Sequence, residues 1–99
     1  MKQKFFIIII CLIDTLKMMA QEFTLQGRVT DDDNNPVELA TVSVVSQGKV
    51  AFTSLKGEFS MHLHSADSVA VKFSMIGYKT KVRILRKPRG KQTLQVVLH

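Results

Sequence analysis

Apolar and polar residues alternate along most of the chain after residue 21. Between residues 22 and 30 the apolar side chains are Phe23, Leu25 and Val29, and apart from Gly27 the residues beside them are polar. A period of two is typical of a strand with one buried face. Six further segments show this pattern, and no stretch has the spacing of an amphipathic helix. The predicted strands are residues 22–30, 39–46, 50–53, 58–64, 68–74, 79–85 and 93–98.

Clusters of turn-forming residues separate these segments. One cluster of Asp and Asn residues ends at Pro36, and the loop before the last strand contains Pro88 and Gly90. Seven short strands joined by turns predict an all-β sandwich in which two sheets pack face to face. The residues predicted to face the core are Phe23, Leu25, Val29, Ala40, Val42, Val44, Phe59, Met61, Leu63, Val69, Val71 and Phe73.

The first twenty residues have the pattern of a secretory signal peptide. Two lysines precede a run of nine apolar residues, and Ala20 offers a small residue for cleavage. At about 1.5 Å per residue, this run spans about 14 Å and is too short for a membrane core of about 30 Å. We therefore expect residues 1–20 to be a cleaved signal peptide rather than a membrane anchor. Residues 21–99 then form one domain without a membrane span.

Removing the leader changes the composition that must be explained. The full chain has 99 residues and a net charge of +6. The leader holds three of the 14 basic residues, one of the 8 acidic residues and the single cysteine, so the remaining 79 residues have a net charge of +4. A domain this small without disulfides favours an accessory or binding module over an enzyme. Export without disulfides is common in bacteria, which favours a cell-envelope protein.

His62 and His64 are the first candidates for chemistry. Residues two apart on a strand share a face, and two imidazoles there can hold a metal ion. A catalytic zinc site usually has three protein ligands, however, and the only further ligand nearby is Glu58. We therefore predict no metal site, and the two histidines stay open only as an alternative to plain solvent-exposed residues.

The acidic turn before the second strand partly matches a calcium-binding loop. Asp31, Asp33 and Asn35 fit the first ligand positions of an EF-hand, but Pro36 stands where glycine is required and Val42 where glutamate is required. A looser calcium site of oxygen ligands remains an alternative. We expect a solvated turn.

Seven basic residues and no acidic residue occur between positions 79 and 91. Such a strip could attract nucleic acid, anionic lipid or an acidic protein surface. Lys79, Lys81 and Arg83 stand at alternate positions, which is the simpler pattern of a strand with one solvated face. For an exported chain, nucleic acid is not the expected partner.

No catalytic constellation is visible in the sequence. The serines lack the elbow motif of a nucleophile, and no pair of carboxylates occupies adjacent inward positions. There is no glycine-rich phosphate loop and no tryptophan to stack on a sugar. We therefore predict neither an enzyme nor a bound cofactor.

Three segments in this order and spacing resemble the carboxypeptidase-like regulatory domain. They are residues 27–44, residues 53–61 and residues 73–79, and Ser54 departs from the family pattern by replacing an acidic turn residue. Folding alone gives these residues roles, since proline fixes a turn, glycine permits positive φ and inward phenylalanines anchor the sheets. The motif residues are Gly27, Asp31, Pro36, Ala40, Gly57, Phe59, Phe73, Gly77 and Tyr78.

The resemblance implies a fold and a context. The implied fold is a seven-stranded antiparallel Greek-key sandwich similar to transthyretin (prealbumin). In Bacteroidetes such domains stand at the N-terminus of TonB-dependent outer-membrane receptors of the SusC/RagA type. We therefore expect a non-catalytic accessory domain, in the periplasm or at the outer membrane, that binds an envelope or outer-membrane protein. The alternatives are a carbohydrate- or surface-binding module and a regulatory fragment of a metallocarboxypeptidase. The oligomeric state is left open.

Overall fold

The structure, a computed structural model, describes residues 22–99. The predicted signal peptide, residues 1–20, lies outside the described residues. Within residues 22–99 no helix is long and apolar enough to cross a membrane. The strands are β1 (Glu22–Thr30), β2 (Thr41–Val44), β3 (Lys49–Phe52), β4 (Glu58–His64), β5 (Ser68–Ser74), β6 (Lys81–Arg86) and β7 (Gly90–Val97), and a 3-10 turn, η1 (Val45–Gln47), follows β2.

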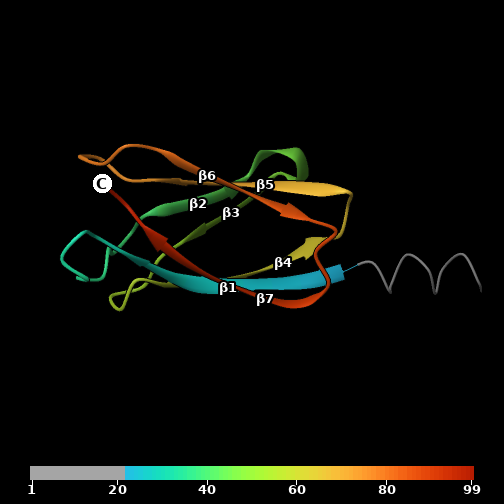
Figure 1. Cartoon of the computed structure of the whole chain (residues 1–99), viewed down its shortest axis with the longest axis horizontal. Coiled ribbons are helices and arrows are strands. Elements are labelled where there is room, and N and C mark those ends of the chain that lie inside the picture. The colour runs from blue at the N-terminus through green and yellow to red at the C-terminus, as the bar shows by residue number, and fades with distance from the viewer. Residues whose placement is uncertain (1–21) are drawn as a thin grey trace, which may run out of the picture.

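Two sheets pack face to face in the sandwich (Figure 1). One sheet has three strands in the order β4-β1-β7, and the other has four in the order β3-β2-β5-β6. The first described strand and the last strand are therefore neighbours in the smaller sheet. The prediction of an all-β sandwich with seven strands is confirmed.

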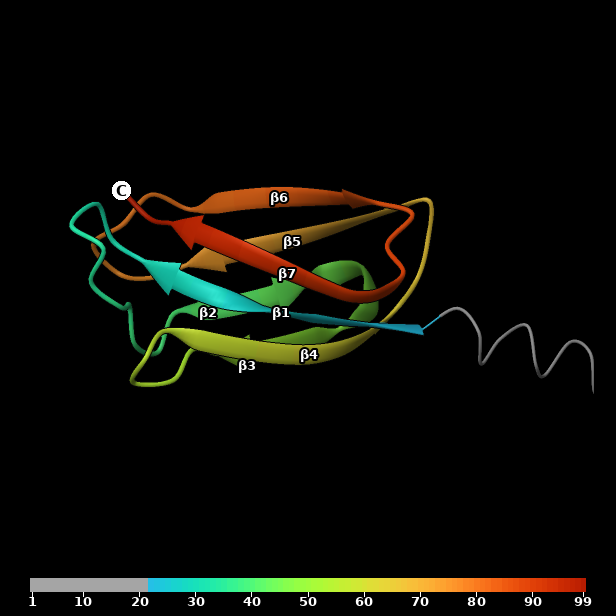
Figure 2. The same ribbon diagram turned by 60° about the horizontal axis from the view of Figure 1, so that its bottom comes forward.

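One pairing differs from the expected antiparallel arrangement. β1 and β7 are parallel, with Phe23 opposite Gly90 and Thr30 opposite Val97, and both arrows point the same way in Figure 2. The other four pairings are antiparallel. The prediction of an entirely antiparallel sandwich is therefore wrong for this pair. β7 reaches β1 after a crossover from the other sheet, and such a connection does not impose the reversal that a hairpin does.

Four strands differ from prediction at their ends, and β3 is displaced by one residue, to Lys49–Phe52 instead of residues 50–53. β2 stops at Val44 because the chain turns into η1, and Gly48, with a positive φ of 62°, closes that turn by donating its N–H to the Val45 carbonyl. β6 begins at Lys81 instead of residue 79. β7 begins at Gly90 instead of residue 93, because its parallel pairing with β1 extends to that end.

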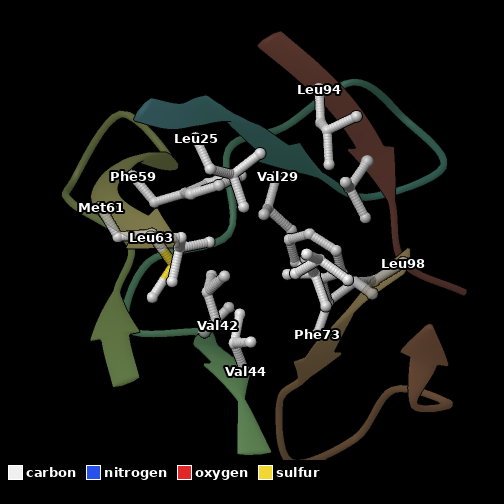
Figure 3. Packing of buried hydrophobic residues seen from close by; sticks show 14 of the residues in the cluster. Leu25, Val29, Val42, Val44, Phe59, Met61, Leu63, Phe73, Leu94 and Leu98 are labelled. Atoms are coloured by element: carbon white, nitrogen blue, oxygen red, sulfur yellow. The ribbon is translucent and has the colours of Figure 1, made fainter. Parts of the chain in front are cut away.

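The core lies between the two sheets (Figure 3). Every residue that the alternation predicts to face inward is buried. Phe73 on β5 meets Phe59 on β4 edge to face, with ring centroids 5.6 Å apart. Such aromatic pairs contribute about 0.5–1.5 kcal/mol beyond the burial of their area. Leu94, Val96 and Leu98 complete the core from the C-terminal end.

The basic face of β6 is not its solvated face. Phe73 and Val71 point into the core, and their partners on β6 are Lys81 and Arg83. These two bases are consequently half-buried, whereas Val82 and Ile84 on the opposite face are 54% and 61% exposed. The expectation from the alternation is therefore wrong for β6. Because β6 is an edge strand, long basic side chains can cover the rim of the core while their charged ends reach water.

Candidate functional site

Gly27 lies at the centre of β1, between Phe59 on β4 and Leu94 on β7. A Cβ added at Gly27 would collide with the main-chain oxygen of Leu94 and would stand 3.0 Å from the Phe59 ring. The absence of a side chain thus lets the Phe59 ring lie over β1. Gly27 has a packing role in this structure.

Pro36 and Gly57 meet at the end of β1. Thr30 forms an isolated bridge with Pro36, and Val29 donates its N–H to the Gly57 carbonyl at 2.8 Å. The methylene carbon of Pro36 lies 3.3 Å from where a Gly57 Cβ would be. Pro36 and Gly57 therefore hold the loop after β1 and the loop before β4 against the C-terminal end of β1.

Thr53 joins the same region through its hydroxyl group. Its Oγ1 donates to the Val37 carbonyl at 2.6 Å and accepts the Ala40 N–H at 2.8 Å. Thr53 is 2% exposed, so water cannot replace either bond. Thr53 opens the motif segment at residues 53–61, but no pattern in the sequence marks it as a buried hydrogen-bonding residue.

Thr53→Val is expected to lower the free energy of unfolding by about 2–3 kcal/mol, because the Val37 carbonyl and the Ala40 N–H would lose a buried partner. Urea denaturation measures this loss. Thr53→Ser, which keeps the hydroxyl, is the matched control and should recover most of it. A valine variant as stable as the parent would contradict the role assigned to the hydroxyl.

The acidic turn is organised by its own first residue. Asp31 Oδ1 accepts the N–H groups of Asp33 and Asn35, each at 2.9 Å. Asp32 forms an ion pair with His99 at the C-terminal end. One Asp31 oxygen thus accepts hydrogen bonds within the turn. Residues 22–99 contain no group of three or more His, Cys, Asp or Glu side chains placed to hold a metal ion.

His62 and His64 lie on the exposed face of β4. His62 Nδ1 is 3.1 Å from Thr24 Oγ1, and His64 Nδ1 is 3.8 Å from Glu22 Oε1. Each histidine is therefore turned toward a β1 residue directly across the strand pair.

Zinc is expected to leave the melting temperature of the protein unchanged, because two exposed imidazoles without a third ligand give little stabilisation. Thermal denaturation with and without equimolar Zn²⁺ measures this. The double variant His62→Ala/His64→Ala is the control. A zinc-dependent rise that this variant abolishes would contradict the prediction.

Gly77 and Tyr78 form the bend that follows β5. Tyr78 donates its N–H to the Met75 carbonyl at 3.1 Å, and Gly77 has a φ of 92°. The Tyr78 side chain is half-buried and packs against the core. This bend reverses the chain into β6 and thereby sets which residues of β6 face the core.

A shallow hollow of about 610 Å³ lies over the smaller sheet. Gln26 stands between Ser60 and Thr93 there, and Gln26 Nε2 donates to Thr93 Oγ1 at 3.3 Å. Arg28, whose Nε donates to the Lys56 carbonyl at 3.1 Å, lies in the next row. The remaining residues that line the hollow are Gly27, Phe52, Ser54, Glu58, Phe59 and Gln95. The hollow offers several polar groups and one exposed aromatic ring.

The outer face of the larger sheet has a different character. Its outer strands expose Val50 and Phe52 on β3 and Val82 and Ile84 on β6. The seven bases between positions 79 and 91 lie just before β6, on β6, in the loop after it and at the start of β7. We call these bases the basic rim. The two ion pairs among residues 22–99 both join a histidine to an acid, and neither involves the rim.

Solved structures with a similar fold belong to varied proteins. A chain of a type II cohesin–X-dockerin complex from Acetivibrio cellulolyticus matches with a TM-score of 0.66 and 19% identity over 77% of this chain and 56% of that one. A DUF3823 family protein from Bacteroides ovatus matches with a TM-score of 0.57 and 11% identity over 78% and 44%. The 3-chlorocatechol 1,2-dioxygenase from Rhodococcus opacus gives 0.61 and 8% over 78% and 58%. These likenesses concern the fold alone, and this chain spans little more than half of each of those chains or less.

Sequence comparison identifies the family. No curated protein sequence matches the chain. The model of the carboxypeptidase regulatory-like domain matches residues 24–99, from the third described residue to the last, and includes all nine motif residues. The chain therefore belongs to the carboxypeptidase regulatory-like domain family.

Proposed function

We propose that this chain is an exported, non-catalytic interaction domain of the bacterial cell envelope. Residues 1–20 act as its signal peptide, and the domain stands at the N-terminus of a TonB-dependent outer-membrane receptor. Membership of a regulatory-like family supports a non-catalytic module. The finer description as a Greek-key, transthyretin-like sandwich belongs to the same proposal.

The observation that carries this proposal is the exposed apolar surface of the larger sheet. Val50, Phe52, Val82 and Ile84 are each more than half exposed, although the core is already complete without them. They form two pairs at opposite edges of the sheet, separated by β2 and β5, and an exposed apolar pair on an edge strand offers contacts to another protein. A protein-binding role follows from this surface, whereas the motif residues are accounted for by packing.

The receptor context is tested by reading the coding DNA beyond the His99 codon. A reading frame that continues into a plug and an outer-membrane barrel is the expected result. A stop codon followed by an unrelated gene would refute the receptor context and leave an independent domain. Export is tested separately by N-terminal sequencing of the periplasmic protein, which should begin at Gln21.

The hollow over the smaller sheet favours carbohydrate binding as a second candidate function. Its side-chain amides and hydroxyls suit the hydroxyl groups of a sugar, and Phe52 offers an exposed apolar ring beside them. A glycan array decides between the two functions. Binding that Gln26→Ala abolishes would support the sugar site, and no binding on the array would remove it.

A further inference from the structure

Within the described part of the chain, β6 is an edge strand whose second side has no partner strand. In the larger sheet it pairs only with β5. Among residues 22–99 its main chain makes no backbone hydrogen bond outside that pairing. Six residues at about 3.3 Å each give a free edge about 20 Å long, which Figure 2 shows along the rim of the molecule. An extended peptide can add to such an edge as a new strand.

The other long edges are already partly occupied. On β4, the Gln47 side-chain amide bonds both the N–H and the carbonyl of His64, at 2.8 and 2.7 Å. At the other end of β4, Ser54 bonds the N–H and the carbonyl of Glu58. On β7, the Val97 carbonyl accepts a hydrogen bond from Lys81 Nζ at 3.2 Å. β6 is therefore the long edge best placed to receive another strand.

The side chains of β6 specify what a new strand should carry. Lys81 and Arg83 project on the inner side of the edge, and Val82 and Ile84 project on the outer side. Since neighbouring strands place side chains of the same face together, one face of the partner would lie beside bases and the other beside apolar groups. Opposite charges favour such cross-strand pairs, and like charges disfavour them.

We propose that the free edge of β6 binds an acidic extended protein segment, in which carboxylate and apolar residues alternate, as a fifth strand of the larger sheet. This inference rests on the proposed function as a protein-binding domain and names the partner's chemistry. A second copy of β6 does not fit, because three of its six residues are basic and none is acidic. Pairing two such edges would oppose like charges.

The probe is a fluorescent peptide of about ten residues in which valine and glutamate alternate, long enough to cover the edge at about 3.3 Å per residue. Fluorescence anisotropy should show saturable binding to the purified protein in about 50 mM NaCl. The affinity should fall about tenfold at about 300 mM NaCl, because salt screens exposed charges. Hydrogen exchange should show new protection at alternate amides of residues 81–86.

Charge reversal supplies the decisive comparison. Lys81→Glu/Arg83→Glu, which reverses the two bases on the inner side of the edge, should weaken binding of the glutamate peptide about tenfold and create binding of a valine–lysine peptide. Lys49→Glu/Lys56→Glu changes the net charge equally at a distance from β6 and should leave both peptides unaffected. Circular dichroism confirms that each variant is folded.

Two results would overturn the proposal. One is no saturable binding of the glutamate peptide by the folded parent protein. The other is binding whose new amide protection falls on β3, β4 or β7 instead of β6. Neither result bears on the receptor context, which is tested separately by the coding DNA beyond the His99 codon.

Discussion

Phe73→Ala is expected to lower the free energy of unfolding by about 3–5 kcal/mol. Phe73 is fully buried, and its ring contacts both Phe59 and the inner faces of the two sheets. A domain of this size has about 4–12 kcal/mol of stability in total. The substitution should therefore remove a large fraction of the total stability.

Urea denaturation, followed by circular dichroism, measures the effect of Phe73→Ala. Phe52→Ala is the matched control, since it removes the same side chain from a position that is 61% exposed. It should cost much less than the core substitution, because little apolar area returns to water. Equal losses in the two variants would show that the ring of Phe73 is not the centre of the core.

Gly57→Ala is expected to lower the free energy of unfolding by about 2–5 kcal/mol, from two causes that add. The φ of Gly57 is 76°, where an L-residue is strained by about 1–2 kcal/mol. The new methyl group would also collide with the main-chain oxygen of Val29 and crowd the nitrogen of Val37 at 3.3 Å. Forcing extra atoms into a packed site costs about 1–3 kcal/mol.

Gly77→Ala separates these two causes. Gly77 also has a positive φ, 92°, but an added methyl group would meet no atom within 4 Å. Gly77→Ala should therefore lower the free energy of unfolding only by the conformational strain, about 1–2 kcal/mol. If both alanine variants lost the same stability in chemical denaturation, the close approach of Gly57 to β1 would have no energetic weight.

The alternation of residues predicted the strands of the interior well. Val42 and Val44 on β2, and likewise Val69 and Val71 on β5, are buried as their spacing predicts, because a two-residue period places them on one face whatever the partner strand is. A strand in the middle of a sheet must hide that face. The alternation was therefore sufficient to predict which residues of these strands are buried.

The alternation predicted the wrong buried face for β6, at the edge of the larger sheet. β6 has both apolar and basic residues in alternation, and the apolar ones, Val82 and Ile84, are the exposed ones. The inward face is set by the register with β5, in which Lys81 is opposite Phe73. At this edge the core does not require an apolar residue, so the local pattern did not determine the orientation of β6, whereas the edge strand β4 buries the residues that its pattern predicts.

The candidate sites divide in a similar way. The histidine pair and the acidic turn were visible as spacings, and the structure shows which neighbours each contacts. Thr53 and the hollow over the smaller sheet depend on residues far apart in the sequence. Thr53 bonds Val37, which precedes it by 16 positions, and Gln26 bonds Thr93, which follows it by 67. No spacing in one segment could predict these contacts.

An all-β domain, the identity of most core residues and the resemblance to the regulatory-like family could be predicted from the amino-acid order, because each depends on periodicity or short motifs. The parallel pairing of β1 and β7, the inward orientation of Lys81 and Arg83, and the long β6 edge that residues 22–99 leave without main-chain partners could be seen only in the folded chain. These features depend on which strands become neighbours. Neighbours are chosen by the packing of the whole chain, so no local stretch of residues encodes them.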